Sequence, residues 1–309
     1  DCWATSIATE ASTRSTTPTA SMNTLSRRLL GVLSPMVING REAAKEILTK
    51  VREDIADLGH EPIVRAIVLQ PSAATESYLS IKERRAREAG MYLELVRLED
   101  DATTEQVLEK IALPGADAII VQLPLPSSVD QERILNAIPL ACDADVLSHE
   151  AHARFEAGEE GALLPPVVAA VKEVLERSNV MPAGKTAVVV GKGWLVGEPV
   201  ATWLSAQGAQ VTSITREAGD LSSLLGADII VSGAGSPGLI RPEHLSPGVV
   251  LIDAGTAESG GAIVGDADPA CAAVASVFTP VPGGVGPMAV ACLFRNAATL
   301  AKRNRLQAP

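Results

Sequence analysis

A tyrosine and a lysine four positions apart form the pair with the clearest chemical potential in this sequence. Tyr78 and Lys82 belong to the segment YLSIK, in a stretch that predicts a helix opening near Thr75. Their spacing places a phenol and an ammonium group on the same face of that helix, one turn apart. Such groups can contact a ligand and transfer protons. The charged run Glu83–Arg85 that follows leaves a solvent-exposed helix as the alternative.

Other polar residues stand where predicted strands end. Gln122 interrupts the apolar run ADAIIVQLPLP just before Pro124, at the carboxyl end of a strand, where open α/β sheets bind ligands. A buried glutamine needs a hydrogen-bond partner, from the protein or from a ligand. Asp143 and Asp145 follow in the loop of IPLACDADVLS. One of these acids could brace the turn, and the other could bind a polar heterocycle.

A glycine-rich turn comes later, where the buried strand TAVVVG leads into GKGWLVGEP. Gly191, Gly193 and Gly197 stand before an amphipathic helix. This order suits a dinucleotide, because the backbone must approach the pyrophosphate and the helix amino end offers free N–H groups. The spacing is GxGxxxG rather than GxGxxG, and tight strand-to-helix packing is the other explanation for the glycines.

Basic residues near this turn favour a phosphorylated ribose. Arg216 ends the next strand, AQVTSIT, where an NAD enzyme usually presents an acid, and Lys192 lies in the glycine turn. Together they suit a 2′-phosphate and favour NADP over NAD, although Glu217 leaves a solvated arginine as the alternative. Glycines in the turns after two later strands are expected to keep the groove open: Gly233, Gly235 and Gly255.

The segment VFTPVPGGVGPMAV, residues 277–290, precedes the last predicted helix. Its prolines stiffen the backbone, and Gly283 and Gly284 leave it without side chains. Such a loop lets a flat ligand lie against the main chain, and a tight turn before the helix is the simpler explanation.

The elements around these residues alternate between strand and helix, which predicts parallel sheets in an α/β fold. The chain has 309 residues, 47% of them hydrophobic, which suffices for two compact domains. A net charge of -11 disfavours nucleic-acid binding, and no apolar run has the roughly 18 residues of a membrane span. The four cysteines show no metal-binding spacing, so we expect no metal and reduced thiols in the cytoplasm.

Several separated motifs in order resemble the bifunctional methylenetetrahydrofolate dehydrogenase/methenyltetrahydrofolate cyclohydrolase family. They are YLSIK, VQLPLP, VVVGKGWLVGEP, ADIIVSGAGSPGLI, VVLIDAG and TPVPGGVGPM, and the resemblance spans about residues 37 to 305. It implies an α/β catalytic domain (37–164 plus a returning helix, 287–305) and a Rossmann-type NAD(P)-binding domain (165–286), with a cleft between them. It also implies a cytoplasmic homodimer. The Ser/Thr-rich residues 1–36 are expected to be a disordered extension, similar in composition to a transit peptide.

By position, the resemblance implies roles for individual residues. It gives the catalytic residues as Lys82, Tyr78, Gln122 and Asp145, the last of which holds the pterin. It gives the cofactor contacts as Gly191, Lys192, Gly193, Val196, Gly197, Arg216, Gly233, Gly235 and Gly255. The substrate contacts are Tyr78, Pro282, Gly283 and Gly284.

The chain also departs from the family pattern. Where the family reads KDVDG this chain reads CDADV, so Val146 stands in place of the glycine, and where it reads PCTPxG this chain has PPVVAA at 165–170. Gly193 replaces a serine and Ala289 a threonine, and each change removes a hydroxyl. Because of these differences, the family pattern does not determine the shape of the folate pocket in this chain.

The resemblance predicts oxidation of 5,10-methylenetetrahydrofolate by NADP and hydrolysis of the methenyl product to 10-formyltetrahydrofolate. These steps belong to tetrahydrofolate interconversion, which serves purine biosynthesis. Lys82 is the candidate for proton transfer in the hydrolysis, with Gln122 adjusting its charge and Tyr78 packing on the pterin side. The alternatives are a monofunctional dehydrogenase and a catalytically silent folate- or nucleotide-binding protein. Dehydrogenases of the shikimate or amino-acid type lack the VQLPLP and TPVPGGVGPM segments, which disfavours them.

Overall fold

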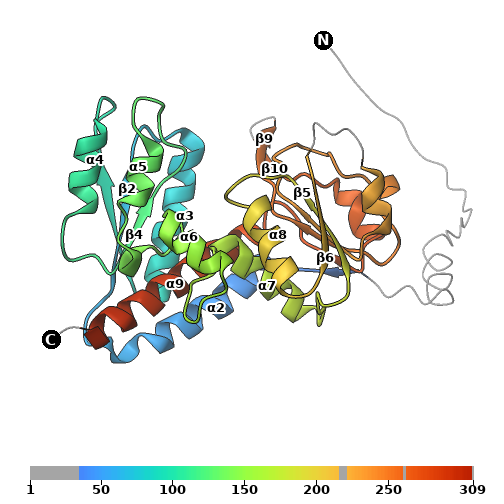
Figure 1. Ribbon diagram of the computed structural model, residues 1–309, viewed down its shortest axis with the longest axis horizontal. Helices are drawn as coiled ribbons and strands as arrows, with labels where there is room; N and C mark the ends of the chain where they lie inside the picture. Colours follow the sequence, from blue (N-terminus) through green and yellow to red (C-terminus); the bar gives the residue numbers. More distant parts are fainter. Residues whose placement is uncertain (1–34, 216–220, 260–261, 308–309) are drawn as a thin grey trace, which may run out of the picture. The chain divides into compact units, whose positions relative to one another are not determined.

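The computed structural model describes residues 35–215, 221–259 and 262–307, and within them the chain builds two parallel sheets with helices on both faces (Figure 1). One sheet has three strands in the order β3-β2-β4, and the other has six in the order β1-β11-β8-β7-β5-β6. A two-stranded antiparallel hairpin, β9-β10, is separate from both. The predicted α/β class with parallel sheets is confirmed.

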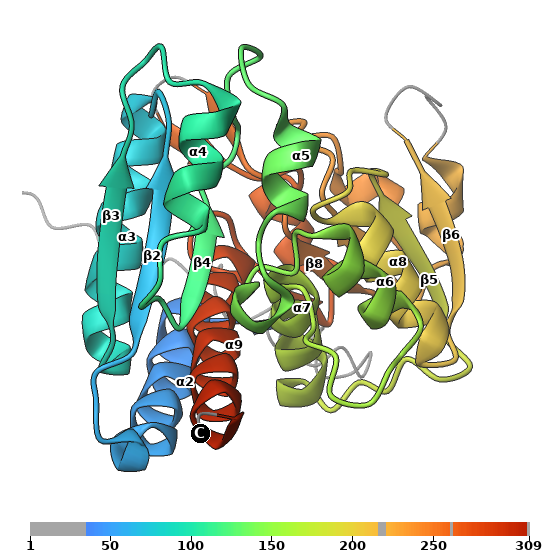
Figure 2. The ribbon, with the colours of Figure 1, turned by 60° about the vertical axis from the view of Figure 1, so that its left-hand side comes forward.

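The three-stranded sheet belongs to the first half of the chain, and Figure 2 shows its strands side by side. Its elements are α2 (Gly40–Asp54), η1 (Ala56–Leu58), β2 (Ile63–Val68), α3 (Ala73–Ala89), β3 (Tyr92–Arg97), α4 (Thr104–Ile111), β4 (Ala118–Val121), α5 (Gln131–Asn136), η2 (Leu140–Cys142) and α6 (His149–Glu156). The central strand β2 is buried along nearly its whole length, as expected for a strand covered on both faces. One core packs it against α2, α3 and α9, and another lies on the opposite face with α4 and α5.

The six-stranded sheet forms from the second half of the chain together with the short strand β1. Its elements are β1 (Met36–Val37), α7 (Pro166–Arg177), β5 (Thr186–Val190), α8 (Gly197–Ala206), β6 (Gln210–Ile214), η4 (Ser222–Gly226), β7 (Ile229–Ser232), η5 (Pro242–His244), β8 (Val250–Asp253), η6 (Pro269–Ala273) and β11 (Val277–Phe278). The hairpin of β9 (Ala257–Ser259) and β10 (Ala262–Val264) follows β8. The strand order changes direction between β5 and β7, and ligands of such sheets bind outside the carboxyl ends of the strands at this point.

Strand β1 was not predicted from the sequence. Met36 pairs with Val277 and Val37 with Phe278, so these residues form an outer strand of the six-stranded sheet. From the sequence alone, Met36 is expected in the extension and Val37 in the folate-binding domain. The backbone groups of an extended segment are satisfied by the free edge of β11, and two residues are too few to show a periodic pattern.

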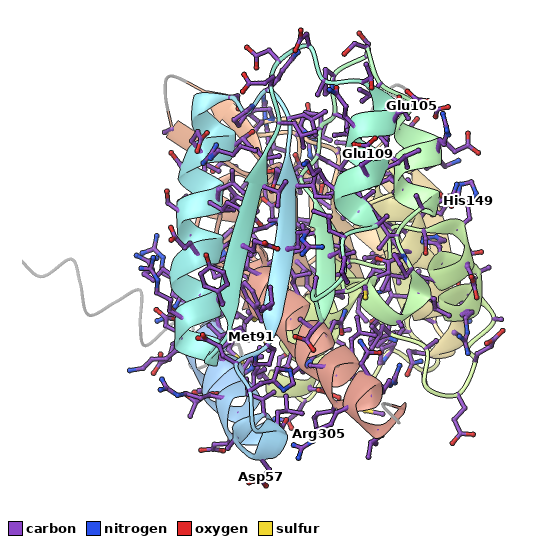
Figure 3. The ribbon with its side chains drawn as sticks, turned by 90° about the vertical axis from the view of Figure 1, so that its left-hand side faces the viewer. Asp57, Met91, Glu105, Glu109, His149 and Arg305 are labelled. Carbon is purple, nitrogen blue, oxygen red and sulfur yellow. The ribbon has the colours of Figure 1, made fainter. Side chains whose placement is uncertain are left out.

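The last helix, α9 (Val285–Gln307), comes from the end of the sequence but packs against elements of the first half of the chain. It lies beside α2 in both ribbon views (Figures 1 and 2) and also packs against α7. Near the far end of the pair, the Arg305 guanidinium donates to the backbone carbonyl of Asp57, and Figure 3 shows both residues at that end. The helix begins two residues before the predicted Pro287. Across the described residues, none of the helices combines the length and apolar character needed to cross a bilayer.

Candidate functional site

A cavity of about 210 Å³ opens at the carboxyl end of β4, next to the glycine turn that follows β5. Four of its lining residues are those singled out from the sequence for catalysis: Tyr78, Lys82, Gln122 and Asp145. They come from α3, from the end of β4 and from the loop after η2. The fold therefore brings together residues that are as many as 67 positions apart in the sequence.

Lys82 is held inside this cavity by a hydrogen bond and by an aromatic ring. It is 6% exposed, and its Nζ donates to Oε1 of Gln122 at 3.0 Å. The Gln122 amide donates in turn to the carbonyl of Leu123 at 2.7 Å, which fixes the orientation of its oxygen. The Lys82 Nζ also lies 5.4 Å from the centroid of the Tyr78 ring, within the range of a cation–π interaction. The predicted solvent-exposed alternative for Lys82 is therefore wrong.

Burial controls the electrostatics of this group. It lowers the pKa of Lys82, and the nearby Asp145 carboxylate partly opposes that change. Burial also raises the pKa of Asp145, which the charge of Lys82 opposes and that of Asp143 reinforces. For Tyr78, desolvation of the hydroxyl comes first and the Asp145 charge second, and together they raise its pKa to about 12. Tyr78 thus stays a phenol at neutral pH, although its ring faces the cavity and 37% of the residue is exposed.

The two neighbouring aspartates have different surroundings. Asp143 is 1% exposed and accepts hydrogen bonds from the backbone N–H groups of Leu147 (3.0 Å) and Ser148 (2.8 Å), and from the Ser148 hydroxyl (2.7 Å). It is the acid that braces the turn. Asp145 instead lines the cavity beside Lys82. The hydrogen-bond pattern thus separates two acids whose roles the loop sequence left open and of which the family resemblance singled out Asp145.

Val146, next to Asp145, has an unusual backbone. Its φ is +58°, in the left-handed region that a β-branched residue rarely adopts, at a cost of roughly 1–2 kcal/mol. The side chain is 3% exposed and lines the cavity. The conformation that a glycine would adopt freely is kept here, and the glycine's place in the pocket is filled by an isopropyl group.

Sequence reasoning missed several residues of the cavity wall, notably His152 and Trp194. Their rings stack with centroids 5.5 Å apart and an interplanar angle of 30°. His152 comes from α6, a helix that was not predicted, whereas Trp194 lies within the glycine turn. A bulky aromatic residue inside a glycine-rich motif was the signal that could have identified Trp194. The stack joins this turn to helix α6 at the cavity wall.

The glycines of the turn after β5 have different structural roles: two allow close packing, and one lies beside open space. Gly191 has φ +106°, and a Cβ on Gly197 would lie 2.1 Å from the Gly191 carbonyl oxygen. These two glycines therefore allow the strand and helix α8 to approach closely. Gly193 is exposed, and a Cβ there would meet no atom within 4 Å. Open space thus lies beside Gly193, and Lys192 next to it is also exposed.

The other predicted cofactor residues lie at the neighbouring strand ends. A Cβ on Gly233 would lie 2.4 Å from Cγ1 of Val196, so the turn after β7 packs directly on the glycine turn. A Cβ on Gly255 would lie 2.2 Å from the carboxyl carbon of Asp266, whereas one on Gly235 would meet nothing closer than 3.8 Å. Arg216 lies outside the described residues.

The loop that the sequence predicts to contact the substrate together with Tyr78 does not line the cavity, whereas Tyr78 does. Pro282, Gly283 and Gly284 are not among the residues that line the cavity. The loop instead packs on the start of α2, where a Cβ on Gly40 would lie 1.8 Å from the Gly284 carbonyl oxygen. Gly283 has φ +110°, which requires glycine.

Within the described part of the chain, no group of three or more His, Cys, Asp or Glu side chains is arranged to hold a metal ion.

Comparison with known proteins finds the same two-part organisation. The family models for the tetrahydrofolate dehydrogenase/cyclohydrolase catalytic domain and NAD(P)-binding domain match residues 38–145 and 165–305. The chain is 35% identical over 280 residues to the bifunctional protein FolD of Lacticaseibacillus casei, covering 86% of this chain and 97% of that protein. It is 35% identical over 276 residues to FolD of Methanospirillum hungatei, covering 87% and 98%.

Solved structures show the same likeness. The bifunctional FolD methylenetetrahydrofolate dehydrogenase/cyclohydrolase of Campylobacter jejuni superimposes with a TM-score of 0.84 at 30% identity, covering 87% of this chain and 99% of that one. The Trypanosoma brucei dehydrogenase-cyclohydrolase, solved with NADP cofactor and an inhibitor, gives a TM-score of 0.84 at 32% identity, covering 89% and 99%.

Proposed function

Because the chain belongs to the tetrahydrofolate dehydrogenase/cyclohydrolase family, we propose that it catalyses both reactions of that family. It oxidises 5,10-methylenetetrahydrofolate to the methenyl compound with NADP, and it hydrolyses the methenyl compound to 10-formyltetrahydrofolate. The cavity with Lys82, Gln122, Asp145 and Tyr78 is the folate side of the site. The observation that carries the proposal is the buried hydrogen bond from Lys82 to Gln122 in that cavity.

The turn after β5 fits a dinucleotide. Open space beside Gly193 and the amino end of α8 at Gly197 leave room for a pyrophosphate near free backbone N–H groups. The exposed Lys192 adds positive charge to this turn. We assign the remaining contacts to Gly191, Val196, Gly233, Gly235, Gly255 and Arg216. When bound, NADP supplies the acceptor for the hydride.

The dehydrogenase step requires orientation more than acid–base chemistry. Tyr78 offers its ring as a wall for the flat pterin side, and Asp145 can accept hydrogen bonds from a polar heterocycle. Val146 and the His152–Trp194 stack limit the space that a substrate can occupy. Pro282, Gly283 and Gly284 are proposed as further substrate contacts. No protein nucleophile is needed for hydride transfer.

The hydrolysis needs a group that can give and take a proton. Burial lowers the pKa of Lys82, which brings an amine closer to the range where both protonation states are populated. Gln122 holds the Lys82 Nζ in place through its carbonyl oxygen, and Asp145 partly restores the charged form. Lys82 is therefore the residue that steers proton transfer as water adds to the methenyl carbon.

Replacing Lys82 by methionine tests this assignment. We expect the rate of methenyltetrahydrofolate hydrolysis to fall by about 100-fold or more, the usual contribution of a positioned proton-transfer group, while hydride transfer is less affected. Lys45→Met, on the exposed side of α2, is the matched control and should leave both rates unchanged. Equal loss of both activities in the Lys82→Met protein would contradict the assignment.

The assembly, the domain limits and the compartment complete the proposal. We assign residues 37–164 with the returning helix to the folate-binding domain and residues 165–286 to the nucleotide-binding domain. The protein is a cytoplasmic homodimer that serves tetrahydrofolate interconversion and purine biosynthesis. Light scattering on the purified chain tests the dimer, since a monomer mass would contradict it.

A further inference from the structure

A buried carboxylate organises the turn after β7. Asp266 is fully buried, and its Oδ2 accepts hydrogen bonds from the Ser232 hydroxyl at 2.6 Å and from the Ala234 N–H at 2.7 Å. Its Oδ1 accepts from the Ser236 N–H at 2.6 Å. One side chain, distant in sequence, thus fixes both the start and the end of this turn.

A second buried carboxylate does the same for the turn after β8. Asp253 is 1% exposed and accepts from the backbone N–H groups of Gly255 at 2.9 Å and Ala267 at 2.8 Å. Its own N–H donates to the hydroxyl of Thr279 at 2.7 Å, and Thr279 begins the loop that leads to α9. Asp253 therefore connects the end of β8 to that loop and to Ala267, whereas Asp266 connects the end of β7 to the segment that contains Ala267.

The backbone is built closely around these carboxyl groups. A Cβ on Gly255 would lie 2.2 Å from Oδ2 of Asp266, and a Cβ on Gly265 would lie 2.1 Å from Oδ2 of Asp253. The glycine at 255, which the sequence suggested as a groove residue, therefore also makes room for a buried acid. Each turn fits around the acid that the other segment supplies.

The turn that Asp266 holds lies against the dinucleotide turn. A Cβ on Gly191 would lie 2.8 Å from the Gly233 carbonyl oxygen, and one on Gly233 would clash with Val196. Because there is no room for even a Cβ at either glycine, the two turns are closely packed, and we expect a shift of residues 233–236 to displace residues 191–196 as well. The glycine turn thus packs on the turn that Asp266 holds, although Asp266 itself does not line the cavity.

We propose that Asp266, supported by Asp253, is a positioning residue for NADP: it holds residues 233–236 in the one arrangement that places the glycine turn for the nucleotide. Two buried carboxyl groups in one loop cluster are costly for stability, and each is retained with its hydrogen-bond donors. This inference rests on the proposed function. It extends that function to Asp253 and Asp266, which are not among the proposed folate or NADP contacts and which act through their hydrogen bonds to the turns.

The test compares Asp266→Asn with Asp268→Asn in the full chain. Asp268 lies in the same loop and caps η6 by accepting from the Ala270 N–H at 2.8 Å, so it is a matched control for the loss of one carboxylate. In Asp266→Asn, an amide group replaces an oxygen that accepts from backbone N–H groups. The measurements are NADP affinity by calorimetry, the KM for each substrate, the hydrolysis rate, and hydrogen exchange of the amides in residues 233–236.

The expected result is specific to the nucleotide. Asp266→Asn should raise the Kd and KM for NADP about tenfold or more, because a charge-assisted hydrogen bond is lost, while folate KM and the hydrolysis rate change less than about twofold. Amide exchange in residues 233–236 should become faster, and Asp268→Asn should behave as wild type. Unchanged NADP affinity in folded Asp266→Asn, or equal loss of hydrolysis, would overturn the proposal.

A milder variant covers the case in which Asp266→Asn does not fold. Ser232→Ala removes one donor to Asp266 and should weaken NADP binding by about two- to fivefold, with faster exchange in the turn. Unchanged exchange and affinity would overturn the proposal. If the wild-type chain binds no NADP, the proposed function fails, and the amide exchange still decides whether Asp266 holds the turn.

Discussion

Replacing Asp253 by asparagine should change how the stability of this protein depends on pH. Burial raises the pKa of Asp253 from 3.8 to about 6, with the charge of Asp266 as a smaller contribution in the same direction and backbone hydrogen bonds opposing it. The folded state therefore holds this proton more tightly than the unfolded chain does. As a result, the free energy of unfolding decreases as the pH rises from below 4 through about 6.

The size of the effect follows from the two pKa values. The difference between 3.8 and about 6 corresponds to about 3 kcal/mol in full, of which roughly 1.4 kcal/mol falls between pH 5 and pH 8. An asparagine at this position does not titrate. Any hydrogen bond that its amide loses adds a constant offset, so only the change of the difference with pH reports the ionisation of Asp253.

Urea unfolding followed by circular dichroism, at pH 5, 6, 7 and 8, measures this change. Relative to wild type, Asp253→Asn should gain about 1.4 kcal/mol in the free energy of unfolding between the first and the last pH. Asp130→Asn, an exposed cap of α5, is the control and should show a constant difference. A constant or decreasing difference for Asp253→Asn would show that burial does not raise the pKa of Asp253.

Two further predictions concern backbone conformation and space. Val146→Gly should be more stable than Val146→Ala by about 1 kcal/mol in urea unfolding, because the φ of +58° at this position favours glycine. At the control position Val171, inside α7, the alanine variant should instead be more stable than the glycine variant. The same order of stability at both positions would contradict the strain at Val146. Gly255→Ala should lower stability by about 1–3 kcal/mol because its Cβ would meet the Asp266 carboxyl group, whereas Gly193→Ala should change it by less than about 0.5 kcal/mol; equal effects would contradict the described packing.

The residues on regular elements were predictable from the sequence. Tyr78 and Lys82 share a helical face because of their spacing, and Gln122 ends a strand whose apolar run is visible in the sequence. What the sequence could not decide was burial. The charged residues after Lys82 belong to other faces of the same helix, and only the packing of α3 against the sheet shows that the amine lies inside.

The remaining site residues lie in loops and short elements, where the sequence pattern is not informative enough to predict them. Helix α6 is eight residues long and has a weak apolar pattern, so His152 was not recognised as part of the cavity wall. Asp253 and Asp266 belong to turns whose hydrogen bonds depend on long-range contacts, and a sequence pattern of period 2 or 3.6 does not report such contacts. For the same reason, the sequence suggested a role for Gly255 in the groove but could not show that Gly255 also packs against the carboxyl group of Asp266.

The most direct test of the proposed function is an absorbance assay on the purified chain with two substrates. The protein is given 5,10-methylenetetrahydrofolate with NADP or NAD, and the decay of added methenyltetrahydrofolate is followed separately. We expect reduction of NADP in preference to NAD, together with accelerated decay of the methenyl compound. Hydride transfer without hydrolysis would contradict the role of Lys82, and nucleotide binding without either reaction would contradict the proposed function and support a silent binding protein.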